Sequence, residues 1–126
     1  MIFKRKSFHL FRDVKEKLSQ EELNDLKMFL FKLQPLIEDI QVDIHIVPAD
    51  ETTCSRGEEY CILFYSEKKG GYLQNIGYMG EQLDLYLASK NIGSLWFGIG
   101  KVKEEKYSHL DFVIMIAIAK MSENQF

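Results

Sequence analysis

The chain has 126 residues, of which 46% are hydrophobic and 28% are charged, and its formal net charge is -3. That length supports one hydrophobic core rather than two, and the composition excludes a disordered or collagen-like chain. The longest uninterrupted apolar run, Phe112 to Ala119, is eight residues long, which excludes a membrane-spanning helix because such a helix needs roughly 20 residues.

Positive charge gathers at the N-terminus, where residues 1–17 carry six basic and two acidic side chains. A basic end could hold an anion. The sequence pI of about 5.6 nevertheless argues against nucleic acid as a partner, because binding to the phosphate backbone usually needs a basic domain. No secretory signal follows this end, so we expect a cytoplasmic protein in which Cys54 and Cys61 stay reduced.

The first predicted helix begins at a capping box, in which Ser19 is followed three residues later by Glu22. This pairing satisfies backbone groups at a helix start. Leucines then recur at helical spacing as far as Pro35, at positions 23, 26, 30 and 33. The pattern predicts a helix that ends at the proline.

Two strands are predicted next. Residues 41–47 alternate apolar and polar side chains, with Val42, Ile44 and Ile46 facing inward and the polar residues facing outward. This is the period of a strand that is buried on one face. Residues 60–65 form a continuous apolar run that ends in a Ser-Glu-Lys-Lys-Gly-Gly turn, which predicts an interior strand.

The longest periodic segment is Leu73–Lys90, and apolar side chains occupy most of its circumference. Such a helix is expected to be buried on several sides. In so small a chain we expect a second copy of the protein to supply part of that cover, with Gly77 and Gly80 letting the backbones approach closely. The sequence therefore predicts a homodimer through helix 73–90.

The remaining segments complete a sheet. A helix stop at residues 91–93 precedes a short strand, Ser94–Phe97, and a flexible segment at residues 98–100. Residues 111–120 are too continuously apolar to alternate, which predicts a central strand covered on both faces. The result is an α+β domain whose central sheet is flanked by helices.

Common nucleotide and metal motifs are missing from the sequence. Lys103 stands where a dinucleotide fingerprint needs its last glycine, and Val102 stands where a phosphate loop needs Ser or Thr. The three histidines lack zinc-site spacing, so we predict no metal site. Cys54 has no histidine at a fixed spacing to act as its base, so we expect an inert thiol.

The order of several runs carries more information than any single run. A basic Arg-Lys-Ser-x-His run at residues 5–9 precedes the capped helix, and the long helix continues to Gly93 and is followed by Leu-Trp-Phe-Gly at residues 95–98. Together with Glu59-Tyr-Cys-Ile and the run from Phe112, this order resembles the FMN-dependent nitroreductase family, in particular its small TM nitroreductase-like branch. The resemblance covers nearly the whole chain.

The resemblance implies a nitroreductase-like fold, with a mostly antiparallel central sheet, and a homodimer with one FMN per site at the subunit interface. It further implies two-electron transfer from NAD(P)H to a nitro compound, a quinone or a similar small-molecule acceptor. Because the flavin carries the chemistry, no catalytic side chain need be visible.

The same resemblance assigns the cofactor-binding residues by position. Arg5, Lys6 and Ser7 correspond to contacts with the phosphate and ribityl chain, and His9 lies where the family often has a cation near the flavin N1/O2 edge. The backbone at Phe97, Gly98 and Ile99 corresponds to the segment facing the N5/O4 edge.

Two departures from the family pattern open an alternative. Residues 29–48 lack the loop through which larger members hold the flavin ring, and the chain stops at Phe126, without the usual C-terminal extension of the family. From the length and the resemblance we expect a single nitroreductase-like domain over residues 1–126, without that extension. The alternative is a catalytically weak or inactive shortened paralogue that keeps the dimeric scaffold or only binds flavin.

Overall fold

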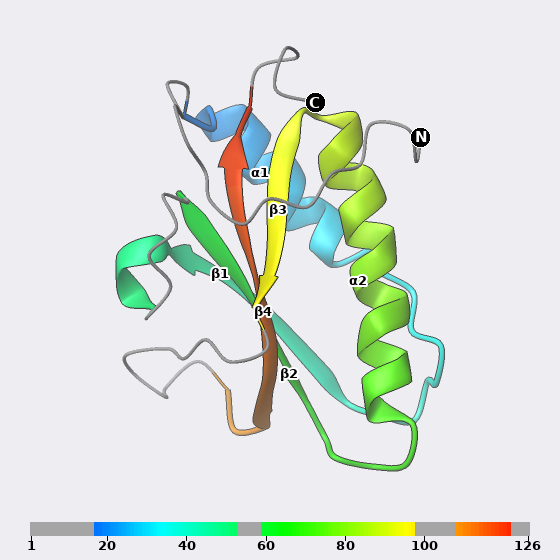
Figure 1. The fold of residues 1–126 in the computed structure, drawn as a ribbon. Coiled ribbons are helices and arrows are strands. Elements are labelled where there is room, and N and C mark those ends of the chain that lie inside the picture. The colour runs from blue at the N-terminus through cyan, green and yellow to red at the C-terminus, as the bar shows by residue number, and fades with distance from the viewer. Residues whose placement is uncertain (1–16, 53–58, 98–107, 122–126) are drawn as a thin grey trace.

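Four strands form one antiparallel sheet, and two helices accompany it (Figure 1). The computed structural model describes residues 17–52, 59–97 and 108–121. The strand order is β1-β2-β4-β3, so β2 and β4 are interior and β1 and β3 lie at the edges. In chain order the elements are α1 (Gln20–Leu30), β1 (Val42–Pro48), the 3-10 helix η2 (Ala49–Glu51), β2 (Tyr60–Ser66), α2 (Tyr72–Ser89), β3 (Ile92–Phe97) and β4 (Asp111–Lys120).

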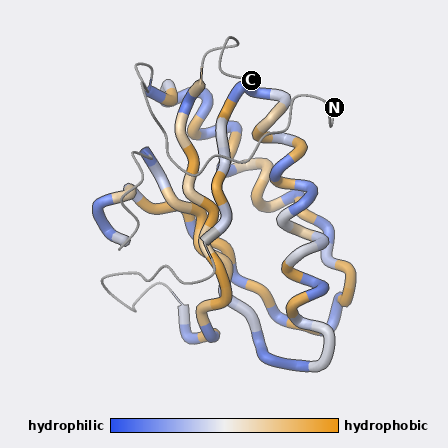
Figure 2. The backbone as a smooth tube through the Cα atoms, in the orientation of Figure 1, coloured by the Kyte–Doolittle hydropathy of each residue, from blue (hydrophilic) through white to orange (hydrophobic). Residues whose placement is uncertain are grey.

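Both described helices pack on the same face of the sheet. Leu26 of α1 and Leu83 of α2 belong to one buried cluster with Phe64 of β2 and Ile116 of β4. Side chains alternate between the two faces of a strand, and the alternate residues of these strands form a second buried cluster on the opposite face, which includes Leu63. The apolar stretches of the sheet are visible in Figure 2. Continuous apolar runs at β2 and β4 thus reflect burial on both faces, as the sequence predicts.

The predicted elements agree with the structure, apart from their ends. The helix expected at residues 73–90 is α2, and the central strand expected at 111–120 is β4 with the same bounds. β3 begins at Ile92, two residues earlier than predicted, directly after Asn91 ends the helix in a left-handed conformation with φ of 58°. Within the described ranges, no helix is both long enough and apolar enough to cross a membrane.

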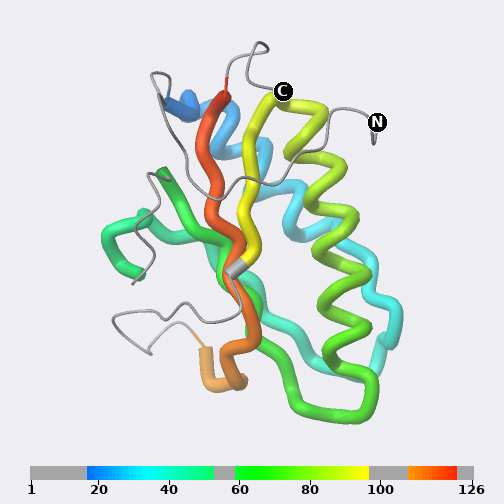
Figure 3. Tube along the Cα trace, in the orientation of Figure 1, coloured from blue at the N-terminus to red at the C-terminus, as the bar shows by residue number. Residues whose placement is uncertain are grey.

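The end of α1 was predicted wrongly. The helix stops at Leu30 instead of continuing to Pro35, because the chain turns there toward α2. The backbone N–H of Gln34 donates to Gln82 Oε1 at 3.0 Å, and Gln82 Nε2 donates to the carbonyl of Gln34 at 2.7 Å. Figure 3 shows the following segment running beside α2. Leu33 is buried as its spacing suggested, although it lies outside the helix.

The start of α1 is tied to the far end of the sheet. Ser19 and Glu22 form the predicted capping box, and Glu22 also accepts a bond from Lys120 Nζ at the end of β4. Lys120 in turn donates to the carbonyl of Lys90, just after α2, at 3.2 Å. The Lys120 ammonium, with the Ser19 backbone N–H, lowers the pKa of Glu22 below its ordinary value.

We expect this carboxylate to make stability depend on pH. Because the pKa of Glu22 is lower in the folded than in the unfolded chain, its contribution is present above the unfolded value of about 4.3 and is lost as the pH falls through the folded value. Glu22→Gln keeps an amide suited to the capping box and is expected to cost about 1 kcal/mol at pH 7. Thermal unfolding from pH 7 to pH 3 measures this difference, which should shrink with acid. Glu21→Gln in the same turn is the control, and an equal loss there would contradict the assignment.

Candidate functional site

The structure describes only one of the seven residues expected to bind the cofactor. Phe97 is the last residue of β3. The other six lie outside the described residues, so their expected grouping around a flavin stays a prediction: Arg5, Lys6, Ser7, His9, Gly98 and Ile99.

Phe97 lies at an edge of the described sheet. β3 pairs with the second half of β4, from Ile92 opposite Lys120 to Phe97 opposite Met115. The first half of β4 pairs with β2 and, among the described strands, with no other. β3 therefore ends beside the middle of β4, and this strand lies next to α2 (Figure 1).

A buried carboxylate fastens β3 to α2. Asp84 of α2 is 1% exposed, and it accepts hydrogen bonds from two side chains of β3. Ser94 Oγ donates to Asp84 Oδ1 at 3.1 Å, and Trp96 Nε1 donates to Asp84 Oδ2 at 2.9 Å. A buried polar group is costly unless it is hydrogen-bonded, so these contacts hold the strand that ends at Phe97 in register with the helix.

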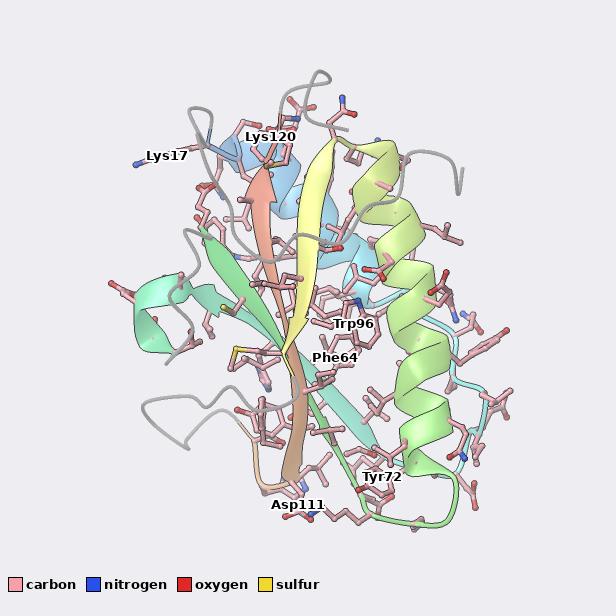
Figure 4. The ribbon with its side chains drawn as sticks, viewed as in Figure 1. Lys17, Phe64, Tyr72, Trp96, Asp111 and Lys120 are labelled. Carbon is pink, nitrogen blue, oxygen red and sulfur yellow. The ribbon has the colours of Figure 1, made fainter. Side chains whose placement is uncertain are left out.

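Trp96 fills the space between β3 and α2 (Figure 4). Its ring lies against Gly80, where an added Cβ would come within 2.1 Å of the ring carbon Cη2. The expectation that Gly80 serves close approach to a second subunit was therefore wrong, because Gly80 makes room for a side chain of its own chain. Gly77 differs, since a Cβ there would meet nothing within 4 Å.

The outward face of α2 carries exposed apolar side chains. Leu73 is 59% exposed and Tyr78 is 48% exposed, and the open position Gly77 lies between them on the same helix. Ile76 and Leu83, by contrast, face the core. Among the described residues, this exposed face is the part of helix 73–90 left for the predicted dimer contact, which stays a prediction.

A hollow of about 490 Å³ lies between α1 and β1. Most of its lining is apolar, and its polar lining residues are Lys27, Asp43 and His45. His45 Nε2 lies 3.1 Å from Asp43 Oδ2, and the imidazole meets the ring of Tyr65 edge to face. This volume lies within the range of small-ligand sites. No group of three metal-ligating side chains occurs in the described ranges.

The sequence reasoning missed Asp84 and Trp96. Two signals were present: a carboxylate within the apolar stripe of the long helix, and the chain's only tryptophan, whose indole N–H needs an acceptor when buried. Cys61, expected to be a reduced thiol, is buried, and its Sγ lies 3.5 Å from Thr52 Oγ1. Cys54 lies outside the described residues.

Comparison with known proteins assigns the chain to a family. A family model described as "Putative TM nitroreductase" matches residues 1–126. No curated protein sequence matches the chain significantly.

Three solved structures share the fold. A nitroreductase family protein from Clostridium novyi NT gives a TM-score of 0.69 at 14% identity, covering 98% of this chain and 84% of that one. A "Putative NADH Oxidase" from Clostridium acetobutylicum gives 0.65 at 12%, covering 96% and 87%. A "putative nitroreductase in complex with fmn" from Desulfovibrio desulfuricans gives 0.63 at 16%, covering 97% and 85%. At such identities the likeness shows the nitroreductase fold alone.

Proposed function

Because the chain belongs to the family described as "Putative TM nitroreductase", we propose that it is an FMN-dependent oxidoreductase that takes electrons from NAD(P)H. The acceptor is a nitro compound, a quinone or a similar small oxidised molecule. The observation that carries the proposal is the match of the family model over all 126 residues. The FMN complex of one structural neighbour and the NADH oxidase description of another support the choice of cofactor and reductant.

The donor set of this chain suits FMN. Arg5 and Lys6 offer charge-assisted hydrogen bonds to a phosphate, and the Ser7 hydroxyl offers a partner for a ribityl oxygen. His9 offers a positive charge when protonated, which favours negative charge on a neighbouring group. When bound, FMN supplies the two-electron chemistry.

The described residues support the proposal by fixing the strand that ends at Phe97. Asp84 and Trp96 hold β3 against α2, so Phe97 ends a strand that is fixed to a helix. A rigid support is what a binding site needs if its backbone groups are to stay within reach of a ligand.

The first test is the visible absorption spectrum of the purified protein after incubation with FMN and removal of free flavin, followed by anaerobic NADH or NADPH. We expect a retained flavin band that bleaches. A retained band that neither reductant bleaches would indicate flavin binding without turnover. The absence of retained flavin would reject the proposal and favour a scaffold without the chemistry.

Arg5→Ala is expected to weaken FMN binding about ten- to a hundred-fold, because one charge-assisted hydrogen bond contributes about 1.5–3 kcal/mol. Flavin fluorescence quenching measures the affinity. Lys17→Ala is the control, since Lys17 is also a basic residue near the N-terminus and its side chain is exposed. Equal losses in the two variants would point to general electrostatic attraction instead of a specific phosphate contact.

We further propose that the active unit is a homodimer formed through the outward face of α2. Tyr78→Glu would place a charge among Leu73 and its neighbours on this face, and burying an unpaired charge is strongly unfavourable. We expect sedimentation velocity at micromolar concentration to show a dimer for the unmodified chain and a monomer for this variant. Ser89→Glu, on an exposed position at the far end of the same helix, should leave the dimer intact.

A further inference from the structure

Along the outer edge of β1, the backbone groups bond to no other strand of the described sheet. The N–H of Ala49 donates to the carbonyl of Glu59, and the N–H of Glu67 donates to the carbonyl of Gln41. These two bonds fix which residues of β1 bond to β2, because the groups of an antiparallel strand alternate in direction. Odd-numbered residues of β1 bond to β2, and even-numbered residues direct their N–H and C=O away from the sheet. β1 is an edge strand of the described sheet.

The hollow described above opens beside this edge. Its apolar lining comes from the end of α1 and the residues just after it, from the even-numbered residues of β1 and from Met79 of α2, and it includes Phe31, which is 88% exposed. Met28, on α1, is 60% exposed. An edge strand next to exposed apolar side chains is a ready template for another strand.

The sequence of β1 is complementary to itself. Two copies of Val42-Asp-Ile-His-Ile46 can pair antiparallel about Ile44, that is, with Ile44 opposite Ile44 of the other copy. Val42 then lies opposite Ile46 of the other copy. Asp43 then lies opposite the other copy's His45, which joins a carboxylate to an imidazole. Pairing about Asp43 or about His45 would instead place like side chains opposite each other, which is unfavourable when they are charged.

The hydrogen-bonding pattern selects the same register. Pairing about Ile44 brings even-numbered residues opposite even-numbered residues, so the outward N–H and C=O groups of both strands bond reciprocally. Asp43 and His45 then form non-hydrogen-bonded pairs, in which side chains approach most closely. Pro48 also faces outward and has no N–H to donate. In this register it lies opposite residue 40 of the other copy, which is outside β1.

The side chains brought in by this register fit the hollow. Directly paired residues of an antiparallel sheet project to the same face. Val42, Ile44 and Ile46 lie on the face that carries the helices, so the same residues of a second copy would enter the hollow below α1. We propose that the outer edge of β1, which no other described strand covers, is a two-fold interface, at which a second copy of this chain pairs its own β1 with Ile44 opposite Ile44.

Amide hydrogen exchange tests the proposal directly. The Tyr78→Glu background removes association through α2, so the outcome does not depend on the dimer proposed above. At high protein concentration we expect slow exchange at the amides of Ile44 and Ile46, and fast exchange after dilution. The amides of Asp43 and His45 bond within the chain and should stay protected at both concentrations, which makes them an internal control. Exchange at Ile44 that is independent of concentration would overturn the proposal.

A charge exchange tests the register. Asp43→Lys places a cation opposite His45 of the other copy, and we expect the dissociation constant of the pair to rise about tenfold, because two cross-strand pairs change together. Adding His45→Glu restores opposite charges in both pairs and should return the constant to near that of the unmodified interface. The register would be overturned if the double variant failed to restore association while the amides that bond β1 to β2 stayed protected from exchange.

Discussion

Replacing Asp84 with alanine is expected to lower the free energy of unfolding by about 3 kcal/mol, because it leaves two donors of β3 without an acceptor. Ser94 is buried and Trp96 is partly buried, so water replaces the lost carboxylate poorly. Chemical denaturation followed by tryptophan fluorescence measures the change, and it also reports on the environment of Trp96 itself.

Two further variants separate the hydrogen bonds from the packing around Asp84. Asp84→Asn keeps one carbonyl oxygen as an acceptor and nearly the same volume, so we expect a loss of about half that of the alanine variant. Asp25→Ala removes an exposed carboxylate from α1 and should cost less than about 0.5 kcal/mol. A loss for Asp84→Ala no larger than that of Asp25→Ala would show that the carboxylate does not hold β3.

Gly80→Ala is expected to destabilise the protein by about 2 kcal/mol, although alanine is favoured over glycine in a helix by about 1 kcal/mol. The added methyl group would meet the rigid ring of Trp96 at 2.1 Å, so either the ring or the helix must move. The free energy of unfolding from denaturant titration measures the result.

Gly77→Ala is the matched control on the same helix. A Cβ at Gly77 meets nothing within 4 Å, so this variant should be stabilised by up to about 1 kcal/mol through helix propensity alone. In a Trp96→Phe background, the smaller ring should remove much of the penalty at Gly80. A penalty that stays unchanged in that background would contradict the contact between the helix and the ring.

Local sequence patterns predicted most of the secondary structure because their physical causes are local. The capping box of Ser19 and Glu22 begins α1 through bonds within four residues. The continuous apolar run at β4 reflects burial on both faces. Its two ends predicted the observed bounds of that strand. The end of α1 could not be read in the same way, since the bonds between Gln34 and Gln82 join positions 48 residues apart.

The assignment of the cofactor-binding residues stays a prediction. The resemblance assigned Phe97 to the flavin-facing segment, and the structure places it at the end of β3. The support beneath β3 could not be predicted from spacing, because Asp84 and Trp96 meet only after the chain reverses direction after α2. The role of Gly80 was misread for the same reason, since a small residue in a helix does not reveal which neighbour it accommodates.

By itself, the sequence determined the α+β class, the order of the elements and the family resemblance, because periodicity, capping and ordered runs are properties of neighbouring residues. The tertiary structure decided which groups of distant elements meet. It paired Asp84 with β3, set Trp96 against Gly80, and turned the even-numbered backbone groups of β1 toward the outer edge of the described sheet. These contacts depend on strand register and on the approach of helix to sheet, and both arise only when the whole core packs.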